Sequence, residues 1–189
     1  MMGKLLLMVS IVLMQAYGFK GFLEKERIGL LELKSFIKSV NNYETEEILV
    51  SWVDDKTSNY CEWERVQCNT TTEHVIKLSL NYIRQFKVNI ISTPSRLPTL
   101  NLSLFHPFEE LRSLDLSGNY FGGWHENKAN DGFRSLKQLK ILDLSWNCFN
   151  ATFLSYLNTL TSLTTLTLEV NNLGESLKSV KQGIQYSIN

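Results

Sequence analysis

The chain has 189 residues, 43% of them hydrophobic, which is enough for one domain with a sizeable core. It contains 19 lysines and arginines against 19 aspartates and glutamates, so its formal net charge is zero. A neutral chain has no overall field that would draw it to nucleic acid or to an anionic bilayer, and we expect no nucleic-acid partner.

The first 18 residues have the three-part layout of a secretory signal peptide. Lys4 supplies the positive charge, residues 5–14 form an apolar run, and Ala16 and Gly18 offer a small-residue cleavage site. A buried N-terminal helix or an uncleaved anchor is the alternative. The apolar run is shorter than the roughly 20 residues that cross a bilayer, and no second run of that length follows. The sequence therefore predicts export and no membrane span.

An amphipathic helix is predicted over Glu24–Val40, where apolar residues recur at three- and four-residue spacings and charged residues occupy the other face. Asn41 and Asn42 end it. A second short helix is predicted over Glu46–Trp52, and Asp54–Tyr60 is polar turn material.

Two cysteines, Cys61 and Cys68, enclose Trp63 and Val66 in the segment CEWERVQC. A metal knuckle would need two further ligands, but only Cys148 and three scattered histidines are present, so we expect no metal or cofactor. A redox pair is usually C-x-x-C, and this spacing is longer. Because an exported chain meets an oxidising compartment, we predict a structural disulfide between Cys61 and Cys68. Cys148 is left without a partner.

Three N-glycosylation sequons are consistent with export. They begin at Asn69, Asn101 and Asn150, and none has proline at its middle position. We expect at least one of them to carry a glycan.

The second half of the chain contains an internal repeat. LRSLDLSGNYF begins at residue 111, LKILDLSWNCF at 139 and LTTLTLEVNNL at 163, each with the pattern L-x-x-L-x-L-x-x-N-x-[LF]. The segment VIKLSL at Val75–Leu80 alternates apolar and polar residues and is interpreted as a degenerate first strand, with an irregular stretch containing Pro94 and Pro98 after it. Residues 123–132 are predicted to form a loop that lengthens the first clear repeat.

This period and pattern are those of leucine-rich repeats. Each unit lays down a short strand whose alternate leucines enter a common core, and the asparagine bonds backbone groups where the chain leaves the strand. We expect these asparagines, Asn119, Asn147 and Asn171, to form a structural ladder along the solenoid. Because a repeat cannot bury its leucines alone, the ends of the stack need caps.

The chain resembles the N-terminal part of plant leucine-rich-repeat receptor-like proteins, which are cell-surface receptors without a kinase domain. The resemblance rests on E-R-x-x-L-L-x-L-K at residues 26–34, the pair Ser51-Trp52, C-x-W-x-x-V-x-C at residues 61–68, and the repeats. It implies an α/β leucine-rich-repeat solenoid with a helical, disulfide-closed N-terminal cap. The expected organisation is a signal peptide over 1–18, a cap over 19–74, repeats over 75–175 and a truncated tail over 176–189.

Three departures from the family pattern stand out. The G-x-I-P stretch that builds a second small sheet is reduced to hints at residues 121–124 and 173–176. The glycine that usually precedes the valine of the cysteine motif is Arg65. Members usually carry many more repeats, a C-terminal cap, a membrane span and a short cytoplasmic tail, so this chain is expected to be a truncated product or a small secreted relative.

In such solenoids the residues between the leucines point away from the core and line a surface that can bind a ligand. Stacking is expected to bring two aspartates together and to place apolar side chains beside them, with an exposed tryptophan as the best contact. The candidate ligand contacts are Asp115, Ile141, Asp143, Trp146, Thr167 and Glu169. The structural alternative is that these first repeats touch no ligand.

No catalytic site is predicted, because the aspartates lie on an open surface without a pocket that would shift a pKa. The resemblance implies an extracellular recognition module of a receptor-like protein in development or defence. Its partners would be an extracellular peptide or protein ligand and a co-receptor kinase. A secreted inhibitor of microbial wall-degrading enzymes and a receptor fragment without independent function are the alternatives.

Overall fold

The computed structural model describes residues 23–41, 48–84, 97–125, 132–157, 159–173 and 185–187. The predicted signal peptide and the segment around Pro94 lie outside these residues. So does most of the predicted C-terminal tail.

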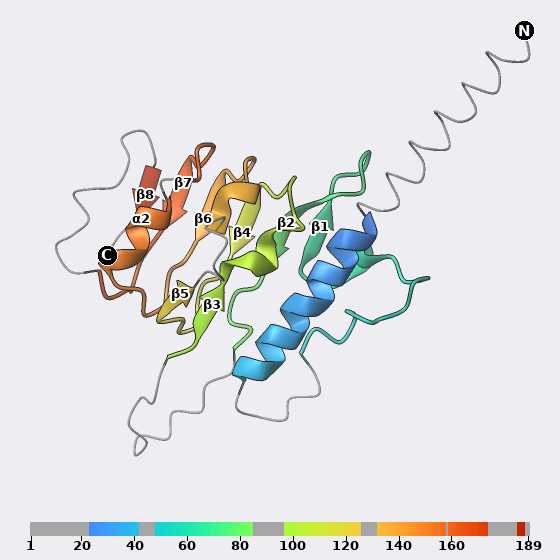
Figure 1. Cartoon of the computed structure of the whole chain (residues 1–189), viewed down its shortest axis with the longest axis horizontal. Helices are drawn as coiled ribbons and strands as arrows, with labels where there is room; N and C mark the ends of the chain where they lie inside the picture. Colours follow the sequence, from blue (N-terminus) through green and yellow to red (C-terminus); the bar gives the residue numbers. More distant parts are fainter. Residues whose placement is uncertain are drawn as a thin grey trace, which may run out of the picture.

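A six-stranded sheet forms one layer of the molecule, in the order β1-β2-β4-β6-β7-β8 (Figure 1). Its first strand, β1, is antiparallel to β2, and each later strand runs parallel to its neighbour. The strands are short because each repeat contributes only the stretch between two turns. Their bounds are β1 Val66–Cys68, β2 Val75–Ser79, β4 Ser113–Asp115, β6 Ile141–Asp143, β7 Thr165–Thr167 and β8 Gln185–Ser187.

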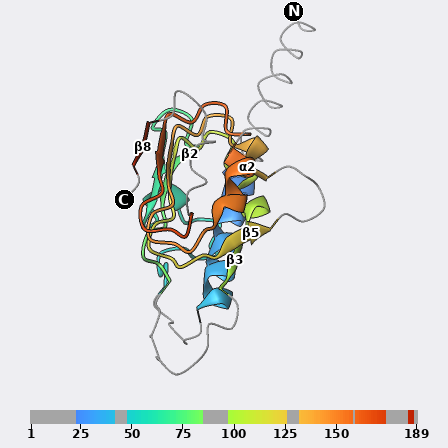
Figure 2. The same cartoon turned by 90° about the vertical axis from the view of Figure 1, so that its left-hand side faces the viewer.

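The opposite layer contains the N-terminal helix, short helical turns and a second sheet, which Figure 2 shows edge-on beside the first. The second sheet pairs β3 (Thr99–Asn101) with β5 (Gly123–His125) in parallel. The expectation of a loop starting at residue 123 was therefore wrong at its first three residues. The helical turns are η2 Leu102–Phe105, η3 Gly132–Ser135, η4 Ala151–Phe153 and α2 Leu154–Leu157.

The core lies between these layers and is built from the repeat leucines. Leu78, Leu114, Leu142 and Leu166 are in register on neighbouring strands, and each is fully buried. Period-two alternation turns the flanking residues of each strand to the other side of the sheet. The stacked arrangement confirms the leucine-rich-repeat solenoid.

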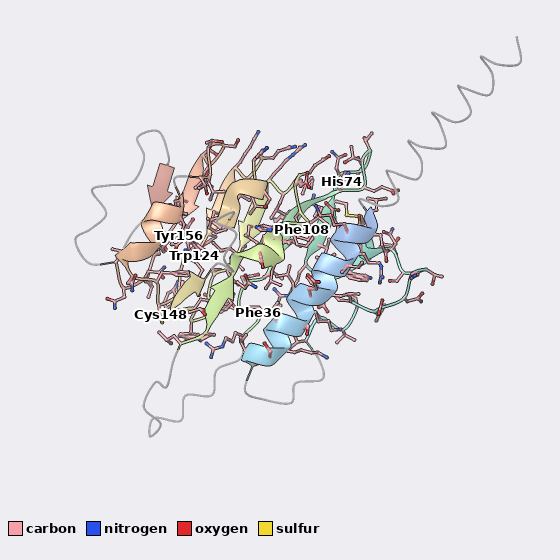
Figure 3. The ribbon with its side chains drawn as sticks, viewed as in Figure 1. Phe36, His74, Phe108, Trp124, Cys148 and Tyr156 are labelled. Atoms are coloured by element: carbon pink, nitrogen blue, oxygen red, sulfur yellow. A yellow bond between two sulfur atoms is a disulfide. The ribbon has the colours of Figure 1, made fainter. Side chains whose placement is uncertain are left out.

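An aromatic cluster centred on Trp124 fills the space behind the later repeats. Its ring meets Phe133, Phe149 and Phe153 at centroid distances of 5.0, 4.9 and 5.3 Å. Tyr156 approaches from α2 at 6.1 Å, beside Trp124 in Figure 3. Offset and edge-to-face pairs of this kind add stability beyond the apolar area that they bury.

The N-terminal helix covers residues 23–40 and buries one apolar face against the first repeats. Leu30, Leu33 and Ile37 are at most 3% exposed, whereas Ile28, which the periodicity assigned to the buried face, is 44% exposed. Gly29 permits this close packing, since a Cβ there would lie 2.7 Å from a ring carbon of Pro107. The helix therefore closes the open end of the core.

The cysteine motif forms the predicted disulfide, with Cys61 and Cys68 Sγ atoms 2.02 Å apart. Cys61 lies in η1 (Tyr60–Glu62) and Cys68 in β1. Between them, Trp63 is 3% exposed and stacks on Trp52 at 5.9 Å, so both rings belong to the cap core. The short helix predicted to end at Trp52 is a turn where the structure describes it, over residues 48–51.

The backbone conformation at Arg65 explains why the family pattern has glycine at this position. Its φ of 66° is in the left-handed region, which glycine adopts without steric cost. Here the guanidinium Nη1 donates to the carbonyl oxygens of Ser79 and Asn81, at 2.9 and 3.0 Å. These bonds connect the disulfide-closed segment, residues 61–68, to the end of β2 and offset part of the backbone strain.

A buried carboxylate joins the N-terminal helix to η1 and to β2, the first of the parallel strands. Glu26 is 1% exposed, and its Oε2 accepts from the Val75 N–H at 3.0 Å and lies 3.1 Å from the Tyr60 hydroxyl. Its Oε1 lies 3.2 Å from His74 Nδ1 (His74 is labelled in Figure 3). Burial raises the pKa of Glu26 above its ordinary value, although the three contacts oppose that shift.

Candidate functional site: the open face of the six-stranded sheet

The side chains that alternate with the core leucines form rows across the outer face of the six-stranded sheet, called here the open face. Strand pairing places Ser113 beside Ile141, which in turn lies beside Thr165. In the second row Asp115 lies beside Asp143, and Asp143 beside Thr167. One residue before the strands, Arg112 and Lys140 are exposed and form a basic edge. The predicted proximity of the two aspartates is therefore confirmed.

In each of the two aspartates, one carboxylate oxygen accepts hydrogen bonds from the protein. Asp115 Oδ1 accepts from the N–H and the hydroxyl of Ser117 at 3.0 and 2.7 Å. Asp143 Oδ1 accepts the same pair of bonds from Ser145, at 2.9 and 2.7 Å. Among the described residues no protein donor reaches the second oxygen, Oδ2, of either side chain. Each carboxylate is thus held by its own turn through Oδ1, and both residues are partly exposed.

The asparagines of the repeat pattern form the ladder at the end of the strands. Asn147 Nδ2 donates to the Leu116 and Leu144 carbonyls, both at 3.0 Å, and its Oδ1 accepts from the Phe121 N–H at 2.9 Å. Asn119 and Asn171 make the equivalent bonds in their own turns and to the preceding repeat. These side chains are structural, as the repeat physics predicts.

Directly before each ladder position lies a residue in the left-handed conformation. We call the set of Tyr82, Gly118, Trp146 and Val170 the ridge; their φ values are 49°, 69°, 54° and 53°. The ridge is continuous across repeats, because Tyr82 N–H donates to the Ser117 carbonyl, Gly118 N–H to Ser145 and Trp146 N–H to Glu169, at 2.8–2.9 Å.

Three of the four ridge residues carry exposed apolar side chains, and the fourth, Gly118, is buried. Tyr82, Trp146 and Val170 are 61%, 51% and 45% exposed. The Tyr82 ring lies against Gly118, where a Cβ would come within 2.4 Å of two ring carbons. The ring that covers Gly118 therefore requires glycine there, and its φ of 69° is one that glycine adopts without steric cost. Next to the ridge, Tyr120 is 44% exposed.

The other predicted contacts occupy the same face. Ile141 is 46% exposed at the start of β6, and Thr167 and Glu169 are half-buried at the end of β7 and just after it. Tyr82 was missed because its repeat lacks the ladder asparagine. Aligning Leu78 and Leu80 with the leucines of the next repeat would have placed it on the ridge.

The three sequons lie away from this face. Asn69 follows β1, and its Oδ1 accepts from the Thr71 N–H at 2.9 Å. Asn101 ends β3, where its Oδ1 accepts from the Ser103 hydroxyl at 2.8 Å. Asn150 is exposed and bridges Asn172 on the side of the small sheet. Glycans at these positions would leave the ridge open to a ligand.

Features that would suggest catalysis are not assembled in the described part of the chain. It holds no group of three metal-ligating side chains. Cys148 is a half-buried free thiol behind the ladder, and burial raises the pKa of that thiol, which disfavours the reactive thiolate. A polar depression of about 730 Å³ lies on the opposite layer and is bordered by the Lys25–Glu109 ion pair.

A membrane-spanning helix is likewise not found within the described ranges.

Two family models match the chain. A leucine rich repeat N-terminal domain matches residues 23–69, and a Leucine Rich Repeat matches residues 110–129. Among curated relatives, Receptor-like protein 14 and Receptor-like protein 56 of Arabidopsis thaliana are 42% and 39% identical, over 93% and 90% of this chain. The chain spans only 18% and 17% of their length.

Solved structures share the fold. A plant ice-binding protein superposes with a TM-score of 0.57 at 22% identity, over 88% of this chain and 49% of its own. The BIR2 ectodomain from Arabidopsis thaliana gives a TM-score of 0.50 at 25% identity, over 69% of this chain and 62% of its own.

Proposed function

We propose that this leucine-rich-repeat chain, which resembles the N-terminal part of the plant receptor-like proteins, is an extracellular recognition module that binds its ligand through the open face. The observation that carries this proposal is the ridge with its neighbouring carboxylates. Exposed tryptophan and tyrosine are the residue types that most often anchor interfaces. The three exposed side chains of the ridge and the neighbouring Tyr120 form a patch of the kind that marks interaction sites.

Recognition on this face would depend on side chains. β2, β4, β6 and β7 each have a neighbouring strand on both sides, so their backbone groups are already paired and offer little to a ligand. What remains is the basic edge, the two held carboxylates and the ridge. These rows differ in chemistry across the face, which would orient a bound ligand as well as hold it.

The similarity to receptor-like proteins favours a receptor ectodomain over a secreted inhibitor of microbial wall-degrading enzymes. It also supports a binding role rather than an enzymatic one. By that similarity the module would face the cell exterior and act beside a co-receptor kinase in development or defence. An extracellular peptide or protein is the ligand that the resemblance implies.

Site-specific photo-crosslinking tests the proposal. The 189-residue chain is secreted from plant cells with a photoreactive phenylalanine analogue at Ile141 or, as a control, at Val50, which is 60% exposed on the cap. Each protein is irradiated in plant extracellular fluid, and the adducts are identified by mass spectrometry. We expect discrete adducts at Ile141 that are missing at Val50. Identical adducts at both positions, or none at either, would contradict recognition through the open face.

A further inference from the structure

The ridge is an arrangement that chain stability alone does not favour. Only Gly118 is suited to a left-handed backbone; Trp146 and the β-branched Val170 are outliers there. They are held because each turn is fixed by the ladder asparagine and by the ridge hydrogen bonds. Backbone outliers that the surroundings impose tend to occur at functional sites. Trp146 and Val170 are also exposed apolar side chains, 51% and 45% accessible.

The ridge places one side chain or ring on each of several successive repeats. Because the Tyr82 ring leans over Gly118, that ring, Trp146 and Val170 occupy successive repeats. Neighbouring strands are about 4.8 Å apart, close to the length that one sugar unit adds to an extended β-1,4-linked chain. An extended peptide advances by about 3.3 Å per residue, which does not match this spacing.

Polar groups of the right kind lie beside the ridge. Asp115 and Asp143 each present one free carboxylate oxygen, three residues before Gly118 and Trp146 respectively. Sugar hydroxyls donate to such acceptors, and the C–H faces of a pyranose stack on aromatic rings. The basic edge at Arg112 and Lys140 adds donors for further hydroxyl groups. The charged rows balance, which suits an uncharged ligand.

We propose that the ridge and the two held aspartates form a binding site for a neutral β-1,4-linked oligosaccharide, with successive sugars stacked along the ridge. This inference rests on the proposed function, because it names the ligand class for the same face. It replaces the peptide that the resemblance implies with a ligand chosen by the spacing and chemistry of the surface.

Isothermal titration calorimetry of the secreted protein with cellohexaose tests the site. We expect a dissociation constant of about 1 mM or tighter. Trp146→Asn should weaken binding about tenfold or more, with a melting temperature equal to or above that of the wild type, because asparagine tolerates the left-handed conformation. Trp146→Phe, which keeps a ring, should retain most of the affinity.

Asp143→Asn isolates the carboxylate. The amide oxygen can still accept from Ser145, but the free acceptor becomes a donor, so affinity should fall several-fold without loss of stability. Val50→Asn on the cap is the matched surface control and should change nothing. No binding of cellohexaose, or equal binding by wild type and Trp146→Asn, would overturn the saccharide site. If cross-linking at Ile141 still captured a peptide or protein, the proposed function would stand and only this inference would fall.

Discussion

Replacing Asn147 with alanine tests whether the ladder, rather than leucine packing alone, holds the repeats in register. The side chain is 5% exposed, donates to the carbonyls of Leu116, Leu144 and Ser145, and accepts from Phe121 N–H. Alanine would leave the Phe121 N–H without its partner, whereas the three carbonyls would each keep one other donor, from Asn119, Asn171 and Gly118. At about 1–3 kcal/mol for the unpaired N–H and about 0.5–1.5 kcal/mol for each of the three lost carbonyl bonds, we expect a loss of roughly 3–5 kcal/mol. That is a large part of the stability of an ordinary domain, about 5–15 kcal/mol.

The assay is equilibrium urea unfolding of the secreted chain, with Asn119→Ala and Asn171→Ala as comparators. Asn119 is fully buried, whereas Asn171 is half-buried, so water can replace part of its bonding. The expected order of destabilisation is therefore Asn119, Asn147, then Asn171. A loss below about 1 kcal/mol for Asn147→Ala, or an order that does not follow burial, would refute the reasoning.

Three further outcomes are expected. Burial raises the pKa of Glu26, so its contribution is present at low pH and is lost as pH rises above the ordinary value of 4.5. Urea titrations from acid to neutral pH should show wild-type stability falling relative to Glu26→Gln; a constant difference would contradict this. Replacing Cys61 and Cys68 with serine should lower the free energy of unfolding by about 2.5 kcal/mol, from the loss of the loop constraint on the unfolded chain. The change would be measured as a lower urea midpoint, and an unchanged midpoint would argue against a stabilising disulfide. Val170→Asn relieves a left-handed valine, so it should be more stable than the matched strand variant Ile141→Asn by about 1–2 kcal/mol; equal melting curves would argue against strain at the ridge.

The solenoid was predictable because one physical demand recurs in every repeat. Leu114, Leu142 and Leu166 must reach a common core, and Asn119 and Asn147 must satisfy a turn, so the same residues return at the same offsets. The Cys61–Cys68 disulfide was also predictable. The cysteine spacing did not fit a metal site or a redox pair, and the predicted signal peptide indicated an oxidising compartment.

The second sheet was less visible because its strands are short and carry no repeated motif. β3 and β5 are three residues each, lie far apart in sequence, and lack the G-x-I-P pattern that usually signals them. The exposure of Ile28 also escaped prediction, since helical periodicity does not say how wide the buried face is.

At the candidate site, the positions of Asp115 and Asp143 followed from the repeat, but their tethered oxygens did not. The signal was present as D-x-S in both repeats, which predicts a carboxylate bonded to its own turn. The ridge was hidden for another reason. Nothing in the pattern reports the sign of φ, and Trp146 and Val170 are residues that ordinarily avoid the left-handed region.

The most direct test of recognition through the open face uses the four tryptophans as internal reporters. Trp52, Trp63 and Trp124 are 1%, 3% and 9% exposed, whereas Trp146 is 51% exposed. In the secreted chain with ¹⁵N-labelled tryptophan, the indole N–H signals are followed by NMR during titration with cellohexaose, or with any ligand recovered by cross-linking. The account predicts that the Trp146 signal shifts while the other three stay fixed. A ligand that binds and leaves the Trp146 signal unmoved would contradict it.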